Sequence, residues 1–148
     1  MKIIATNKRA TYDYNISLKL DAGLILTGSE VKSLRINSSS IKESYVEDIG
    51  SELWLCNCFI KKYESSSDKD NNPTRKRKLL LNKTELSKVL GSVKREGYSI
   101  VPINIYFNFK GLVKLCIGLG KGKKKFDKRE SQKLKDWNKN KQRLLKNN

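Results

Sequence analysis

A glycine- and lysine-rich stretch, Gly118-Leu-Gly-Lys-Gly-Lys-Lys-Lys-Phe-Asp-Lys-Arg-Glu130, divides this chain into two parts of different character. The residues before it form short apolar runs that alternate with polar residues, and such runs separated by turn residues are typical of a β-rich domain. The residues after it are rich in lysine and include too few apolar side chains to build a core. The sequence therefore predicts a folded domain over residues 1–120 and a basic C-terminal tail over residues 121–148.

Positive charge is concentrated in this tail. The whole chain has a formal charge of +17, and residues 121–148 hold 12 Lys and Arg against 3 Asp and Glu. A segment with so much like charge repels itself unless a polyanion lies against it. We therefore expect a nucleic-acid partner. We also expect the tail to be disordered alone and to become helical, from a start at Asp127, when phosphates match its charge.

The first 120 residues predict about six strands. Apolar and polar residues alternate from Tyr14 to Leu20, and Asp21-Ala22-Gly23 predicts a turn before a short second strand at residues 24–26. Further strands are expected at residues 41–47, 53–60, 98–109 and 112–119. Residues 41–47 and 53–60 are expected to pair as a hairpin, with Trp54 of its second strand in the core. Residues 1–11 are expected to form a basic, mostly polar arm.

Two helices are expected between these strands. The first covers residues 28–35, and the second begins after Asn82, where Asn82 and Glu85 have the spacing of a capping box and Gly97 can end the helix. Strands in hairpin order with a few helices favour an OB-like antiparallel β-barrel, an architecture that binds oligonucleotides and structured RNA. Periodicity does not distinguish it from another small β-barrel.

The composition disfavours several classes of protein. The chain contains no histidine, so it lacks the commonest general acid–base group and metal ligand. Its three cysteines do not have the spacing of a zinc or redox site, and we expect reduced, buried thiols. No apolar run is long enough to cross a bilayer, and the N-terminus lacks the apolar region of a signal peptide. The predicted location is the cytoplasm, and no cofactor or metal is expected.

Recognisable motifs run through nearly the whole chain in collinear order. They are Asn7-Lys-Arg-Ala10 with Asp13-Tyr14 and Ala22-Gly23, Gly28-x-Glu30-Val-Lys-Ser-Leu-Arg35, Pro73-Thr-Arg-x-Arg-Lys-Leu-Leu-Leu-Asn82 with Glu85-Leu86, and Gly118 to Arg129 with its Gly-Lys-Lys and Asp-Lys-Arg signatures. Together they resemble the small protein B family, the SsrA-binding proteins of bacterial trans-translation. Two features depart from it: Phe126 stands where members can carry His or Tyr, and residues 64–72 are not recognisably family-like.

The resemblance implies an OB-fold adaptor that binds the tRNA-like domain of transfer-messenger RNA and, with elongation factor Tu, delivers it to stalled ribosomes. Its tail would occupy the decoding centre and the vacant mRNA channel. The RNA-binding residues implied by the motifs are Glu30, Leu80, Asn82, Lys114, Asn7, Lys32, Arg35, Arg75 and Arg77. Those implied for the ribosomal step are Lys123, Lys124, Phe126, Asp127, Lys128, Arg129 and Trp137.

Each of these residues also has an ordinary structural interpretation. Glu30 can be a solvated helix residue paired with Lys32 or Arg35, and Asn82 can be only a helix cap. Leu80 can belong to the core, or it can point outward if residues 79–81 are extended. Lys114 can lie on a solvated strand face.

Two other functions remain open from the sequence. A general OB-fold ribosomal or single-strand-binding protein would bind RNA without preferring a tRNA-like shape. A nuclease would need clustered carboxylates, and Asp13, Asp21 and Glu30 have no spacing that implies a shared site.

Overall fold

The structure is a computed structural model that describes residues 1–36, 39–63, 72–123 and 125–146. The described part contains four helices, α1 (Ala10–Asp13), α2 (Gly28–Ile36), α3 (Lys83–Glu96) and α4 (Lys125–Lys146). Its strands are β1 (Lys2–Thr6), β2 (Tyr14–Leu24), β3 (Ser39–Ser40), β4 (Tyr45–Ile49), β5 (Glu52–Cys56), β6 (Phe59–Ile60), β7 (Arg77–Leu80), β8 (Ser99–Phe107) and β9 (Val113–Gly122).

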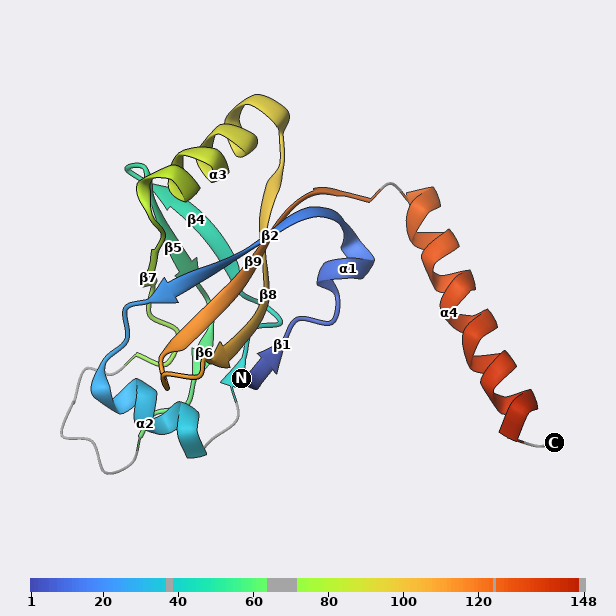
Figure 1. Cartoon of the computed structure of the whole chain (residues 1–148), viewed down its shortest axis with the longest axis horizontal. Helices are drawn as coiled ribbons and strands as arrows, with labels where there is room; N and C mark the ends of the chain where they lie inside the picture. The colour runs from blue at the N-terminus through green and yellow to red at the C-terminus, as the bar shows by residue number, and fades with distance from the viewer. Residues whose placement is uncertain (37–38, 64–71, 124, 147–148) are drawn as a thin grey trace.

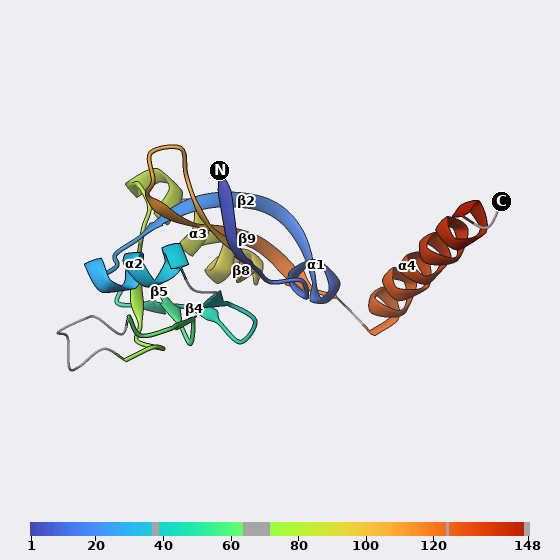
Figure 2. The ribbon, with the colours of Figure 1, turned by 90° about the horizontal axis from the view of Figure 1, so that it is seen from below.

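Seven of these strands form one antiparallel sheet in the order β1-β8-β9-β2-β7-β5-β4, and β3 pairs with β6 in a small second sheet. The large sheet is strongly curved, so that β4 at one edge comes close to β8 near the other (Figures 1 and 2). No hydrogen-bonded ladder joins β4 to β8 among the described residues, and the barrel is therefore open. The predicted mainly β, OB-like architecture with a few helices is confirmed, but with more strands than the six expected.

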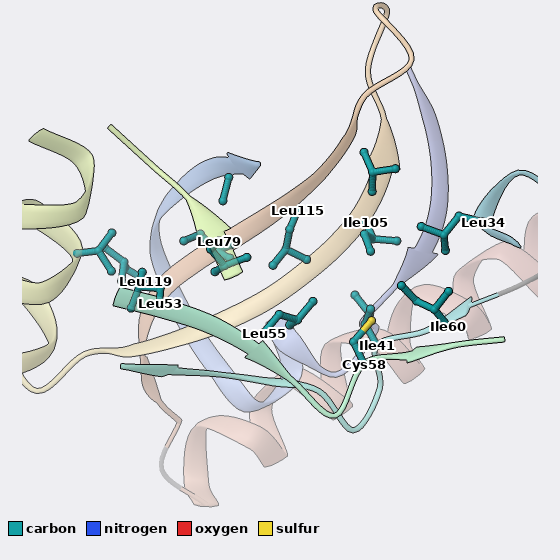
Figure 3. Close-up of a cluster of buried hydrophobic side chains, with 14 residues drawn as sticks. Leu34, Ile41, Leu53, Leu55, Cys58, Ile60, Leu79, Ile105, Leu115 and Leu119 are labelled. Carbon is teal, nitrogen blue, oxygen red and sulfur yellow. The ribbon is translucent and has the colours of Figure 1, made fainter. Parts of the chain in front are cut away.

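The curved sheet encloses the main core. Leucine and isoleucine side chains from β5, β8 and β9 pack together inside it, with Leu34 from α2 and Ile41 closing one end (Figure 3). Leu55, Ile105 and Leu115 have no exposed surface. Burial of such side chains is the main favourable contribution to folding.

Two predictions about the first strands were wrong. Asp21-Ala22-Gly23 does not turn, because these residues pair with Cys116, Leu115 and Lys114 of β9 and β2 continues through them to Leu24. The expected polar arm contains β1, which pairs with β8. Both differences arise from long-range pairing, which local turn propensity does not anticipate.

The hairpin after Ser40 is also shifted. Its first strand begins at Tyr45 instead of residue 41, and its turn lies at Gly50 and Ser51, both with positive φ. Its second strand ends at Cys56, because Asn57 has a φ of 58° and breaks the alternation. Trp54 consequently lies half-buried outside the main core, whereas Leu53 and Leu55 fill it.

Helix α3 confirms the predicted second helix at both ends. The Asn82 side chain accepts a hydrogen bond from the Glu85 backbone N–H (2.8 Å), and the Glu85 side chain accepts one from the Asn82 N–H (3.3 Å). Gly97 ends the helix in the left-handed conformation with a φ of 70°. Local sequence signals are sufficient here because both capping motifs involve residues within one turn of the helix end.

The tail is described as helix α4, the conformation that the sequence predicts for its bound state, and it extends away from the sheet (Figures 1 and 2). Residues 132–145 are exposed along its length. The start of the tail is attached to the folded domain by a hydrogen bond, because the Lys123 N–H donates to the Asp13 carbonyl oxygen (2.8 Å). The disorder expected for the free tail stays a prediction.

The capping box predicts the stability of two variants. Asn82→Ala removes the side-chain oxygen that accepts from the Glu85 N–H, and it should lower the free energy of unfolding by about 1 kcal/mol. Asn82→Asp retains an oxygen acceptor and should remain close to wild type. Urea unfolding measures both, with Lys83→Ala as a control at the neighbouring exposed position. Equal stability of Asn82→Ala and wild type would show that this cap does not stabilise the fold.

Candidate nucleic-acid interface

Three neighbouring strands align Leu80, Gly23 and Lys114 in one row. Gly23 of β2 is paired with Leu80 of β7 on one side and with Lys114 of β9 on the other. A Cβ atom added at Gly23 would lie 3.2 Å from the Cβ of Leu80. Because Gly23 has no side chain, the surface of the row is recessed at its middle position. On either side of it lie Leu80, which is 49% exposed, and the half-buried Lys114.

This row forms the floor of an open groove of about 400 Å³. Helix α2 contributes Val31 and Arg35 to its wall, and the β8–β9 hairpin contributes Gly111 and Leu112. The groove therefore combines apolar surface with two cationic side chains, Arg35 and Lys114. Such a surface can hold a ribose or a base face against leucine while the cations contact phosphates.

A buried ionic cluster connects α2 to β7. Glu30 and Arg77 have essentially no exposed side-chain surface, and Arg75 retains 31%. The Arg77 Nε donates to Glu30 Oε2 (2.6 Å), and its other two nitrogens donate to the carbonyl oxygens of Cys58 (2.7 Å) and Pro73 (3.1 Å). Arg77 is thus satisfied entirely within the protein.

Arg75 completes the cluster at its outer side. Its Nε donates to Glu30 Oε2 (3.1 Å), its Nη2 pairs with Glu30 Oε1, and its guanidinium also contacts the carbonyl oxygen of Ile25 (3.4 Å). The Thr27 N–H donates to Glu30 Oε1 (2.9 Å). One carboxylate therefore joins the start of α2 to both ends of the Arg75–Arg77 segment.

Opposing effects act on the pKa of Glu30. Burial by itself raises the pKa, but the hydrogen bonds from Arg75, Thr27 and Arg77 outweigh it, so the pKa lies below its ordinary value of 4.5. The carboxylate is therefore charged at neutral pH. Its position differs from the exposed acceptor expected from the sequence, because both oxygens already accept hydrogen bonds inside the protein.

The other residues implied for RNA binding lie in separate places. Asn82 caps α3 and is exposed, and the Lys32 ammonium lies 5.9 Å from the centre of the Tyr63 ring. The Asn7 side chain donates to the Pro102 carbonyl oxygen (3.1 Å) and lines a different, polar cavity with Arg9 and Tyr45. The structure brings Arg35, Leu80 and Lys114 into the groove, and Glu30, Arg75 and Arg77 into the cluster, but it does not join all nine.

The tail residues lie beyond the end of β9. Lys123 is half-buried, and Lys124 is outside the described residues. Phe126, Asp127 and Lys128 belong to the first turns of α4, but their side chains are outside the described part. Arg129 is exposed, and Trp137 is 65% exposed.

Sequence reasoning missed Gly23 and Leu112 as parts of the groove. Gly23 carried a signal, a glycine within a strand pattern, which can mark a close approach of backbone or ligand, but it was interpreted as a turn. Leu112 carried none, since its place beside Leu80 depends on the order of strands in the sheet.

The acids that a nuclease would have needed have separate partners. Asp13 pairs with Arg9 (3.4 Å), Asp21 accepts a hydrogen bond from Tyr106, and Glu30 pairs with the two arginines. Burial and the contact with Asp21 raise the pKa of Tyr106 to about 12. Within the described ranges, no three Cys, Asp or Glu side chains gather closely enough to hold a metal ion.

Cys56 and Cys58 are buried free thiols, and burial raises the pKa of both.

None of the helical segments in the described part of the chain has the length and apolar character needed to cross a membrane.

Comparisons with known proteins agree over the whole length of the chain. The model of the SmpB protein family matches residues 4–147. An SsrA-binding protein of Ehrlichia canis (strain Jake) is 49% identical over 148 residues, which cover 100% of both chains. One from Jannaschia sp. (strain CCS1) is 52% identical over 147 residues, covering 99% of this chain and 93% of that protein.

A solved structure described as "tmRNA-SmpB: a journey to the center of the bacterial ribosome" contains a chain of similar fold. The two chains have a TM-score of 0.65 and 42% sequence identity, and the match covers 84% of this chain and 91% of that one. The similarity therefore extends to sequence as well as to fold.

The ionic cluster predicts a pH-dependent stability. Glu30→Gln leaves Arg77 buried without its counter-charge, and it should lower the free energy of unfolding by about 3 to 5 kcal/mol at pH 7. Because the folded-state pKa of Glu30 is lowered, its contribution is present above the unfolded value near 4.5 and is lost as pH falls through the folded value. The gap between wild type and variant should therefore narrow in acid.

Urea unfolding at a series of pH values measures this gap. Glu52→Gln is the matched control, because Glu52 pairs with Lys78 at the surface and both side chains are exposed or partly exposed. Such a pair contributes about 0 to 1 kcal/mol. A Glu30→Gln variant no less stable than Glu52→Gln would contradict a structural role for the cluster.

Proposed function

Because this chain belongs to the SmpB protein family, we propose that it is the RNA-binding adaptor of trans-translation in its cell. In this function it binds the tRNA-like domain of transfer-messenger RNA and delivers it to stalled ribosomes. The observation that carries the proposal is that the family match runs from residue 4 to residue 147, through both the folded domain and the basic tail. The similar chain solved with transfer-messenger RNA supports the same partners.

We divide this function between residues 1–120, as the RNA-binding domain, and residues 121–148, as the ribosomal tail. In the folded domain the groove is the contact surface for the tRNA-like RNA. Arg35 and Lys114 bind phosphates there, and Leu80 packs against a sugar or base. Lys32, Asn82 and Asn7 contribute from separate parts of the domain surface, outside the groove.

Glu30 and Arg77 act as positioning residues in this proposal. They are buried, but their ion pair holds the start of α2, and α2 carries Val31 and Arg35 into the groove wall. Arg75 shares the Glu30 carboxylate and is partly exposed, so it can offer its guanidinium to a phosphate in a fixed orientation.

The tail serves the ribosome. Its charge of +9 in residues 121–148 suits the rRNA that surrounds the decoding centre and the vacant mRNA channel. Lys123, Lys124, Asp127, Lys128 and Arg129 lie at its root, where they would meet the decoding centre. Phe126 and Trp137 supply aromatic rings that can stack on bases.

The remaining parts of the proposal follow from this role. Elongation factor Tu carries the complex, the protein works in the cytoplasm where ribosomes are, and it acts by binding without catalysing a reaction. A cofactor has no part in this mechanism.

Competition binding tests the RNA partner. The full-length protein is bound to a labelled tRNA-like domain and challenged with unlabelled tRNA-like RNA or with unstructured poly-U of equal length. A shaped docking surface should retain its RNA against poly-U at concentrations where the specific competitor displaces it, because poly-U offers charge without shape. Equal displacement would favour the alternative, a general single-strand-binding protein.

Truncation tests the division of labour. Deleting residues 127–148 should leave binding of the tRNA-like RNA within a few fold of wild type, because the groove lies wholly in the folded domain. Peptide tagging in a stalled translation reaction should be abolished. A full-length variant with Asp127, Lys128 and Arg129 changed to alanine retains nearly all of the tail's positive charge, so it separates the loss of these side chains from the loss of bulk charge. A large loss of RNA binding on truncation would refute the separation of the two parts.

A further inference from the structure

Phe109 is the most exposed large apolar side chain in the described part of the chain, at 94%. It lies at the tip of the β8–β9 hairpin, between Asn108 and Lys110. In Figure 2 this hairpin is the loop that projects beyond the body of the protein on the side of the N-terminus. A phenylalanine in this position contributes almost nothing to the core, and its contact with water is unfavourable.

The turn that carries Phe109 is held rigidly. The Asn108 side-chain oxygen accepts from the Lys110 N–H (3.0 Å) and from the Leu112 N–H (2.9 Å). The Asn108 N–H donates to the Leu112 carbonyl oxygen (2.9 Å), and the Gly111 N–H donates to the Asn108 carbonyl oxygen (3.0 Å). Gly111 has a φ of 77°, which a residue with a side chain rarely adopts. The backbone of such a turn loses little conformational freedom when its exposed side chain binds a partner.

The same hairpin forms part of the groove. Gly111, Leu112 and Lys114 line it, and Phe109 lies in the same turn, two residues before Gly111. Lys110, the next residue in the chain, is an exposed cation, and Arg35 lines the groove from α2. An exposed aromatic ring near cationic side chains suits RNA as a partner, because RNA has an anionic phosphate backbone and flat nucleobases that can stack on the ring.

We propose that Phe109 is a stacking platform for one unpaired nucleobase of the RNA that docks in the groove. This inference rests on the proposed function and adds a specificity-determining residue to it. Paired bases in an A-form helix hide their faces, whereas loop bases can be splayed out and stacked on an aromatic ring. Phe109 therefore selects RNA with an unpaired base next to the phosphates bound by Lys114.

Variants at position 109 test the stacking in the full-length protein, with the tRNA-like domain of transfer-messenger RNA as the probe. Phe109→Ala should weaken binding by between about fivefold and about a hundredfold, the range that stacking of one base produces. Phe109→Trp should keep wild-type affinity because indole presents a larger face. Phe109→Leu should fall with the alanine variant, since it is apolar but has no ring. Ile49→Ala is the matched control, an exposed apolar residue beside the turn of another hairpin.

Salt dependence separates stacking from charge. Stacking releases no counterions, so Phe109→Ala should shift the dissociation constant and leave the slope of its logarithm against the logarithm of salt concentration unchanged. Lys114→Ala should reduce that slope by about 0.7 to 0.9, as expected for one lost phosphate contact. A changed slope in Phe109→Ala would show that the variant disturbs the whole groove and would contradict the proposal.

Three further results would overturn the inference. In the first, Phe109→Ala binds as tightly as wild type, while wild type still prefers tRNA-like RNA to poly-U. This result would refute the stacking proposal and leave the proposed function intact. Phe109→Leu could retain full affinity, which would mean apolar packing instead of stacking. Sedimentation could show that wild type dimerises and Phe109→Ala does not, which would make the hairpin a protein contact. A wild type without preference for tRNA-like RNA would refute both proposals.

Discussion

The ion pair between Glu30 and Arg77 is the contact on which the proposed RNA surface depends. Two fully buried charges at 2.6 Å connect α2 to β7, and the remaining donors of Arg77 extend this connection to Cys58 and Pro73. Removing two ions from water is costly, and the pair persists because each guanidinium nitrogen of Arg77 and both oxygens of Glu30 have partners. The ion pair contributes to function by fixing the position of α2, the helix that forms one wall of the groove.

This arrangement changes how a carboxylate in an RNA-binding protein should be understood. An acid near a nucleic-acid surface would repel phosphates if it were exposed. Here the negative charge of Glu30 is paired with arginines inside the protein, and one of them, Arg75, remains partly exposed. The folded domain therefore presents a cationic side chain whose orientation is set by a buried anion, while the tail presents cations on a helix that extends away from the sheet (Figure 1).

Local signals were reliable where the interacting residues are close in sequence. The capping box of α3 and its glycine stop were predicted correctly. For Leu80 the sequence left a core position and an outward position open, and the structure has it exposed between the buried Leu79 and the half-buried Leu81. Local signals failed where partners are distant. The turn predicted at Asp21-Ala22-Gly23 is a strand because these residues pair with Cys116, Leu115 and Lys114 of β9. Trp54 is a different case, since a local break of the alternation at Asn57 leaves Leu53 and Leu55, and not Trp54, in the core.

The amino-acid sequence by itself determined the charge asymmetry, the boundaries of α3 and the collinear motifs, because these are properties of composition and of neighbours along the chain. Only the tertiary structure decided that Glu30 is buried, and that Gly23 lies between Leu80 and Lys114. It also decided that Phe109 stands exposed in the hairpin turn whose next residues, Gly111 and Leu112, line the groove. Those facts depend on strand order and on contacts between residues far apart in the chain, such as Gly23 and Lys114, which are 91 positions apart. The physical reason is that burial is a property of the packed chain, and no local pattern specifies which surface a distant strand will cover.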